Sequence, residues 1–262
     1  MGMQLDKLLN EDPNDPIPNL FLGEFYFSIN DLNNSSAYYI KAHDLDNSTA
    51  AAYEGLGNTY FEQHNTDSAI AMYEAALNLS PRNTIYLNNL ADIHYERKNY
   101  PKASDLYEKT LSLNPYFLAP YCGCANSLRI QGHLGGALRK QEKLIRLFDD
   151  NNITNIRINN LPWLLLNKSG ETISLDSGMK KCYIYYNTAL TYSLLEKETK
   201  TREYLKKAND LNIGEDSTIS VKSILDLDIE NFQDKQHNHT NHIINFRNVL
   251  SQAENKTSKA RM

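Results

Sequence analysis

The fold is decided by the stretch Ala52-Tyr53-Glu54-Gly55-Leu56-Gly57-Asn58-Thr59-Tyr60, which reappears in altered form as Leu87-Asn88-Asn89-Leu90-Ala91-Asp92-Ile93-His94-Tyr95. The two stretches can be aligned at the offset that separates Leu56 from Leu90, which we call the repeat interval. The same interval recurs on both sides of them, in four sets of equivalent positions. These are Pro81 and Pro115; Ala69, Ala103 and Ala137; Tyr39, Tyr73 and Tyr107; and Gly23, Gly57, Ala91 and Ala125. A fixed period of this kind indicates an array of structural repeats.

Each set of equivalent positions has a physical reason in a pair of packed helices. Two helices can cross closely only where the side chains are small, which explains the recurring Gly or Ala. Large apolar residues such as Leu56, Leu90 and Tyr60 fill the space beside the crossing. The recurring proline cannot extend a helix, so the chain turns there. Because one helix pair cannot bury its apolar face alone, the pairs must stack, and the sequence predicts an all-α fold.

The positions Leu56-Gly57, Tyr60, Ala69, Tyr73, Ala76 and Pro81 resemble the consensus of the tetratricopeptide repeat. The resemblance implies an α-α superhelical solenoid, with repeats at 16–49, 50–83, 84–117 and 118–151. The first repeat departs from the consensus at Ser35, where Ala is usual, and at Asn47 instead of Pro. The fourth has Asp149 in place of the terminal proline, so its second helix can run on.

The regions around the regular repeats are expected to close the array. Residues 3–11, within 1–15, fit the second helix of a repeat and predict an N-terminal capping half-repeat; the alternative is a frayed leader. A divergent fifth repeat is expected at 182–215, followed by a capping helix at 216–232 and a polar, disordered tail at 233–262. In the fifth repeat the expected positions hold Ala189, Tyr192 and Ala208.

An insertion at 152–181 interrupts the period between the fourth and fifth repeats. Residues 163–166 and 171–175 are apolar or β-prone and flank the turn 167–170, which predicts a small β-hairpin. An isolated hairpin is unstable and must pack on the helices. Its Trp163 either packs between the fourth and fifth repeats or belongs to a surface that contacts a partner.

Charge and composition narrow the classes of function. The net charge is −5, with +3 on residues 233–262 and −8 on the rest. An acidic body argues against nucleic-acid binding, which needs clustered Lys and Arg. No signal peptide and no membrane-spanning stretch is apparent, so no membrane insertion is expected. Three cysteines, an odd number, favour a reducing compartment, and we expect a cytoplasmic protein.

No enzymatic motif is apparent, so the sequence predicts neither catalysis nor a cofactor. Cys122 and Cys124 lie two residues apart on a predicted helix, where side chains point away from each other, and core thiols are the simpler interpretation. His237, His239 and His242 could hold a metal ion, but without fixed backbone geometry a solvated tail is the simpler interpretation. We therefore predict no metal site.

The resemblance implies that the first helix of each repeat lines a concave groove. The residues expected to point into it are Phe21, Glu24, Phe27, Glu54, Asn58, Phe61, Glu62, Asn88, Asn89, Asp92, Tyr95, Glu96, Asn126 and Arg129. This set contains five carboxylates and one arginine, with aromatic residues between them. It predicts a groove for a protein or peptide segment that carries Lys or Arg and an apolar anchor.

One peptide-binding mode of the family, the carboxylate clamp, uses basic residues beside two asparagines. Asn58 and Asn89 occupy the asparagine positions, but the basic positions hold Glu54, Ala119 and Gly123. A peptide carboxylate would be repelled there, so no clamp is expected. The sequence predicts a protein-protein interaction scaffold or adaptor. The alternative is a structural subunit fixed in a larger assembly, and the oligomeric state stays open.

Overall fold

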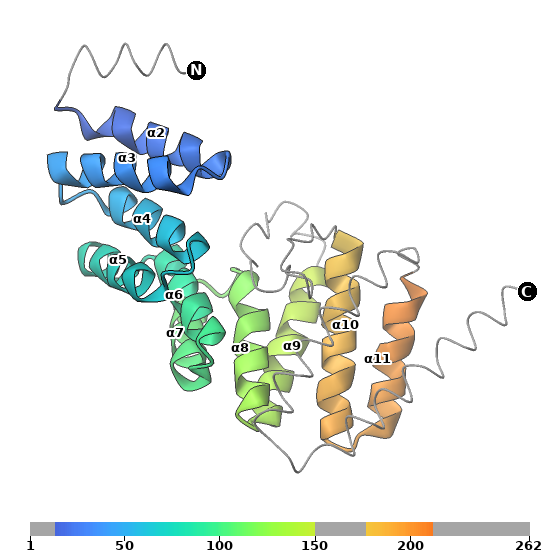
Figure 1. Cartoon of the computed structure of the whole chain (residues 1–262). Helices are drawn as coiled ribbons and strands as arrows, with labels where there is room; N and C mark the ends of the chain where they lie inside the picture. The colour runs from blue at the N-terminus through green and yellow to red at the C-terminus, as the bar shows by residue number, and fades with distance from the viewer. Residues whose placement is uncertain (1–13, 150–176, 212–262) are drawn as a thin grey trace, which may run out of the picture. The chain divides into compact units, whose positions relative to one another are not determined.

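The computed structural model describes residues 14–149 and 177–211, which form ten α-helices and, within those ranges, no strand (Figure 1). The chain divides into two compact units, Met1–Arg97 and Lys98–Met262, which we describe separately. Over these residues the prediction of an all-α fold is confirmed. The predicted hairpin at 163–175, the half-repeat at 3–11 and the segment after residue 211 lie outside the described residues.

The described part of unit 1 contains five helices. They are α2 (Pro16–Ser28), α3 (Leu32–Leu45), α4 (Ala50–Glu62), α5 (Thr66–Leu79) and α6 (Thr84–Glu96). Each helix packs against the next, and α2 also contacts α4 directly. The starts of α2, α4 and α6 follow one another at the repeat interval, and so do those of α3 and α5. The period seen in the sequence is therefore the period of the helix pairs.

The described part of unit 2 contains the other five helices. They are α7 (Tyr100–Leu113), α8 (Ala119–Ile130), α9 (Leu134–Asp149), α10 (Ser177–Leu194) and α11 (Glu198–Asp210). Each again packs against its neighbour in this order. Helix α9 has 16 residues where α3, α5 and α7 have 14, in line with the missing proline at its end. Helix α10 begins at Ser177, inside the range that the sequence pattern assigned to the insertion.

The recurring small residues and tyrosines meet at the helix crossings of unit 1. A Cβ atom added to Gly57 would lie 2.8 Å from the ring of Tyr73, and one added to Gly23 would lie 2.8 Å from the ring of Tyr39. The unusual Ser35 is also accommodated, because its hydroxyl donates to the Gly23 carbonyl at 2.9 Å and contacts the Thr59 hydroxyl at 3.0 Å. The tyrosine rings therefore fix the spacing of the first and second helices.

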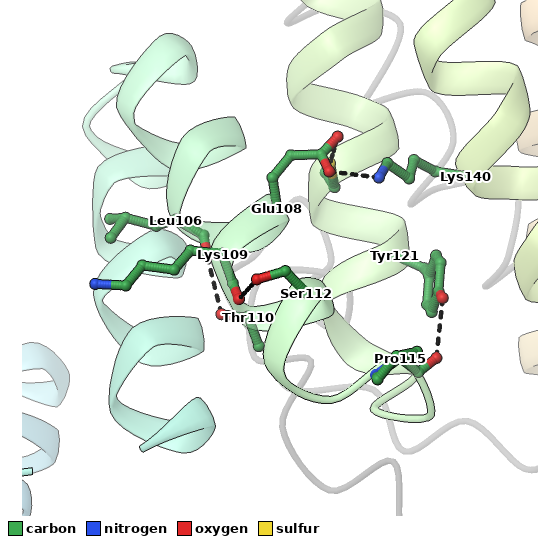
Figure 2. A network of polar contacts seen from close by, with 9 residues as sticks. Leu106, Glu108, Lys109, Thr110, Ser112, Pro115, Tyr121 and Lys140 are labelled. Carbon is green, nitrogen blue, oxygen red and sulfur yellow. Dashed lines mark hydrogen bonds and ion pairs between the residues drawn. The ribbon is translucent and has the colours of Figure 1, made fainter. Parts of the chain in front are cut away.

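Side-chain hydrogen bonds secure the corner between α7 and α8 in unit 2 (Figure 2). The Tyr121 hydroxyl donates to the carbonyl of Pro115 at 2.9 Å, which ties the start of α8 to the turn before it. Glu108 on α7 forms an ion pair with Lys140 on α9 at 2.6 Å. These bonds link three successive helices of the unit.

The turns inside the helix pairs share a left-handed residue. Asn30, His64, Lys98 and Gly132 follow one another at the repeat interval, and all have φ between 58° and 82°. Glu196 has φ 58° at the equivalent place between α10 and α11. Glycine adopts this conformation without strain, whereas residues with a Cβ atom do so at a cost.

Replacing the exposed His64 with glycine is therefore expected to raise the free energy of unfolding by roughly 1 kcal/mol, because it relieves the left-handed strain. Urea unfolding followed by circular dichroism measures this gain. Asn30→Gly is the matched control, and its gain should be smaller, since asparagine tolerates the conformation. A loss of stability in His64→Gly would show that the turn is held by the His64 side chain.

Candidate peptide-binding surface

The predicted groove residues of unit 1 lie on three neighbouring helices. Helix α2 carries Phe21, Glu24 and Phe27, helix α4 carries Glu54, Asn58, Phe61 and Glu62, and helix α6 carries Asn88, Asn89, Asp92, Tyr95 and Glu96. We call Glu24, Glu54, Glu62 and Glu96 the acidic face. Glu24, Glu62 and Glu96 are exposed, and Glu54 is half-buried.

The two central asparagines are joined through a tyrosine from the helix between them. Tyr73 on α5 is only 1% exposed, and its hydroxyl donates to Asn58 Oδ1 on α4. The same hydroxyl accepts a hydrogen bond from Asn89 Nδ2 on α6 at 3.0 Å. Each amide therefore keeps one group without a described partner: Asn58 Nδ2 as a donor and Asn89 Oδ1 as an acceptor. Tyr73 orients both.

The carboxylates of the acidic face interact with one another. Although Glu96 as a whole residue is exposed, partial desolvation of its carboxyl group, followed by the charge of Glu62, raises the pKa of Glu96 to about 7. Burial also raises the pKa of Glu54, and Glu24 raises it further, while a hydrogen bond from Tyr86 opposes the shift. Burial, Glu24 and Glu54 together raise the pKa of Tyr39 to about 12. Desolvation is the larger cause of these shifts, and the neighbouring carboxylates of α2 and α4 add to it.

Three residues expected on the open groove are instead buried. Asp92 is 3% exposed and accepts a hydrogen bond from Asn88 Nδ2 at 2.9 Å. Asn88 and Tyr95 are buried as well. The prediction rested on their positions along the helix. Such positions do not show which other side chains cover a residue in the folded protein. These three residues belong to the interior of the protein.

The apolar part of the surface is larger than the sequence pattern suggested. Phe21 is 50% exposed, and it lies in a row along α2 with Ile17, Phe25 and Ile29, all of them exposed. We call these four residues the apolar row. Their spacing of four residues places them on one side of the helix, and this periodicity was the signal in the sequence that could have revealed them. Phe27 and Phe61 are partly exposed.

Asn126 and Arg129 lie in unit 2 and are fully buried, which corrects their assignment to an open groove. Asn126 Nδ2 donates to the Tyr183 hydroxyl at 3.2 Å, and Asn187 Nδ2 donates to Asn126 Oδ1 at 3.1 Å. Arg129 Nη1 donates to Asn187 Oδ1. Helices α8 and α10 are thus connected by a buried polar network.

The network includes residues that the sequence reasoning missed. Gln141 Nε2 donates to Asn187 Oδ1 at 3.2 Å, and Gln141 lies one repeat interval after Tyr107, at the position of the recurring tyrosines. Asn126 and Asn58 are also equivalent, separated by two periods. Gln141, Asn126 and Asn187 therefore stand where Tyr73, Asn58 and Asn89 stand in unit 1. The repeat interval could have identified Gln141. It could not identify Asn187 as the equivalent of Asn89, because the insertion interrupts the period between them.

The cysteines are core thiols. Cys122, Cys124 and Cys182 are buried and form no disulfide. Burial, followed by the charge of Glu108, raises the pKa of Cys124 to about 12, which keeps the thiol protonated. No group of His, Cys, Asp or Glu in the described ranges is placed to hold a metal ion, and the histidines at 237, 239 and 242 lie outside those ranges.

None of the helices in the described part of the chain is long and apolar enough to cross a membrane.

Comparison with known proteins matches the helical repeats to one family. The model of the tetratricopeptide repeat family matches residues 17–82 and 49–115. None of the curated protein sequences compared with this chain matches it significantly.

Solved structures share the fold. YrrB, described as a TPR protein with an unusual peptide-binding site, is 23% identical with a TM-score of 0.61, over 83% of this chain and 97% of its own. PilF of Pseudomonas aeruginosa is 16% identical with a TM-score of 0.62, over 90% and 88%. MamA is 26% identical with a TM-score of 0.53, over 56% and 86%. The family match therefore shows tetratricopeptide repeats at residues 17–115, and these solved structures show the same fold over a larger part of the chain.

Proposed function

We propose that this protein is an interaction scaffold whose unit 1 binds a basic, partly apolar segment of another protein. The observation that carries the proposal is the acidic face, whose carboxylates repel one another across α2, α4 and α6. A lysine or arginine placed among them would relieve this repulsion. The exposed Phe21 beside Glu24 offers an apolar contact for the same segment.

The oriented asparagines supply the contacts to the backbone of the segment. Asn58 Nδ2 would donate to a peptide carbonyl, and Asn89 Oδ1 would accept from a peptide N–H. Because Tyr73 already holds both amides, little side-chain entropy is lost on binding. Backbone contacts of this kind select an extended segment without reading its sequence, so the acidic face and the apolar row supply the selectivity.

A segment ending in a free carboxylate fits this surface poorly. Glu54 lies one turn from Asn58 on α4, and its charge would repel a terminal carboxylate. The proposal therefore concerns internal segments. YrrB is described as having an unusual peptide-binding site, and the shared fold supports a peptide-binding role here without identifying the peptide.

Selection from a library of random peptides tests the proposal. The full-length protein should enrich peptides that combine Lys or Arg with aromatic or aliphatic residues, and capped C-termini should bind as well as free ones. Enrichment of acidic peptides, or the absence of any enrichment, would contradict the proposal. Tyr116→Ala, which alters an exposed side chain of unit 2, serves as the control protein.

The apolar row favours a second candidate function, that of a subunit fixed in a larger assembly. Contiguous exposed apolar side chains mark interfaces, and Ile17, Phe21, Phe25 and Ile29 form such a patch. A fixed subunit would elute from size-exclusion chromatography of cell extract only at high mass. A scaffold that exchanges partners would elute largely as free protein.

The raised pKa of Glu96 predicts a pH dependence of stability. The pKa of a glutamate in the unfolded chain is about 4.3, whereas that of Glu96 in the folded protein is about 7. Between these values the folded state binds more protons than the unfolded chain, so the contribution of Glu96 to stability falls as the pH rises from about 4 to about 7. Urea unfolding at several pH values should show this fall. It should be smaller in Glu96→Gln and unchanged in Glu74→Gln, and an unchanged profile in Glu96→Gln would refute the assignment.

A further inference from the structure

Two side chains of the apolar row, Phe21 and Phe25, occupy repeat positions that are covered elsewhere in the chain. Phe21 is 50% exposed, and Phe25 is 38% exposed. The position of Phe25 recurs at the repeat interval as Thr59, Ile93 and Ser127, and none of these three residues is more than 1% exposed. A position that is buried in three repeats is therefore open on α2.

The element that covers this side of a repeat is the second helix of the preceding repeat. The position of Phe21 recurs as Gly55 on α4, where an added Cβ atom would overlap the ring of Tyr39 on α3. It recurs again as Asn89 on α6, whose Nδ2 donates to the Tyr73 hydroxyl on α5 at 3.0 Å. In both places the recurring tyrosine of the preceding helix is the neighbour.

The position of Phe25 has a neighbour on the same preceding helix. On α4 it is Thr59, whose hydroxyl lies 3.0 Å from the Ser35 hydroxyl on α3. One turn further, Gln63 Nε2 donates to the Leu32 carbonyl on α3 at 3.3 Å. This side of α4 therefore packs on the second helix of the repeat before it, and the equivalent side of α2 carries the apolar row.

A segment with the pattern of such a helix precedes α2 in the chain. Residues 3–11, which lie outside the described residues, stand one repeat interval before the C-terminal part of α3. Leu5 takes the position of Tyr39, and Leu8 takes that of Ala42, and both of those residues are buried on α3. The spacing of three residues puts the two leucines on one side of a helix.

The sizes of the facing side chains are also complementary. Helix α4 has no side chain at Gly55, and the large ring of Tyr39 fills that space. On α2 the same position holds the large ring of Phe21, and the position of the tyrosine in the preceding segment holds the smaller Leu5. Close packing between two helices requires this kind of exchange of volume.

We infer that residues 3–11 form a helix that docks on Phe21 and Phe25 of the same chain, with Leu5 packed against Phe21. Docking removes the two rings from water, which is the usual fate of their repeat positions. A partner could reach Phe21 only by displacing this segment. The inference does not rest on the function proposed for the acidic face, and its test involves no peptide.

NMR of the full-length protein with labelled leucine methyl groups tests the docking directly. The methyl groups of Leu5 should show nuclear Overhauser effects to the ring protons of Phe21. The absence of these effects would overturn the inference. A mixture of labelled and unlabelled chains identifies the origin of the segment, and effects confined to pairs of different chains would show that a second copy supplies it, which would also overturn the inference.

Two variants with the same change in net charge test the energetic consequence. The double variant Leu5→Asp and Leu8→Asp should lower the melting temperature by about 5 °C and raise the fluorescence of the dye ANS roughly twofold, because the rings become exposed. Lys7→Asp is the control, since Lys7 takes the position of Lys41, which is exposed on α3, and it should alter neither quantity. Equal effects in both variants, or no effect in the double variant, would contradict docking through the leucines.

Discussion

Tyr73→Ala is expected to lower the free energy of unfolding by about 3–5 kcal/mol, the range for deleting a large buried aromatic side chain. Tyr73 is 1% exposed, and its ring packs against Gly57 while its hydroxyl joins Asn58 to Asn89. The substitution would remove apolar contacts of α5 with α4 and leave both amides without their shared partner. Urea unfolding followed by circular dichroism gives the size of the loss.

Two further variants show which part of Tyr73 matters. Tyr116→Ala makes the same chemical change at a residue that is 66% exposed, and its effect should stay within about 0.5 kcal/mol. Tyr73→Phe removes only the hydroxyl and should lower stability by roughly 1 kcal/mol. If Tyr73→Ala were no more destabilising than Tyr116→Ala, Tyr73 would not hold the helices of unit 1 together.

The sequence predicted the helix pairs because their determinants are local and periodic. Small residues at Gly23 and Gly57, prolines at 81 and 115 and apolar positions at helical spacing recur at the repeat interval, and the helices start at that interval. The left-handed turns could not be foreseen in the same way. Of the residues at these turns Gly132 is a glycine, which favours this conformation, whereas His64 and Lys98 have a Cβ atom and adopt it at a cost.

The candidate site was predicted only in part, because the period gives the position of a residue on its helix and not its neighbours. Residues 55, 89 and 123 are equivalent, yet they are Gly, Asn and Gly. A Cβ atom at Gly55 or Gly123 would overlap the ring of Tyr39 or Tyr107, so those rings lie directly against the helix. At Asn89 the tyrosine hydroxyl is hydrogen-bonded instead. The residue at this repeat position therefore decides the local structure. Glycine leaves room for a tyrosine ring against the helix, whereas Asn89 places an amide there that bonds the tyrosine hydroxyl.

The network around Arg129 was beyond reach of the sequence for a related reason. Arg129 and Asn187 are 58 residues apart in the chain, with the insertion between them, so the period does not relate them. The same applies to Asn126 and Tyr183, which are 57 residues apart. Contacts between residues so far apart in the sequence depend on how α8 and α10 pack in the folded protein.

The triple variant Glu24→Lys, Glu62→Lys and Glu96→Lys is expected to bind a basic peptide chosen by the wild type about 100-fold more weakly. Each reversal replaces attraction by repulsion and changes the binding free energy by about 1 kcal/mol, and about 1.4 kcal/mol corresponds to a factor of ten. Most of the loss should appear in the association rate at low salt. Asp92 is left intact because it is buried, and Glu54 because Tyr86 hydrogen-bonds to it.

A matched control makes the same change in net charge on other helices. Asp44→Lys, Glu74→Lys and Asp105→Lys alter exposed residues of α3, α5 and α7, outside the acidic face. This variant should bind the peptide within a factor of about three of the wild type, because the altered residues are not part of the acidic face and salt screens the remaining change in net charge. Circular dichroism of both variants establishes that the helices are retained.

The most direct measurement is the dissociation constant of the selected basic peptide for these two variants, determined by isothermal titration calorimetry at one salt concentration. A loss of about 100-fold in the Glu24, Glu62 and Glu96 variant, with binding retained in the Asp44, Glu74 and Asp105 variant, is the result expected of a scaffold that binds basic segments on its acidic face. Equal affinities for both variants would place the binding surface elsewhere.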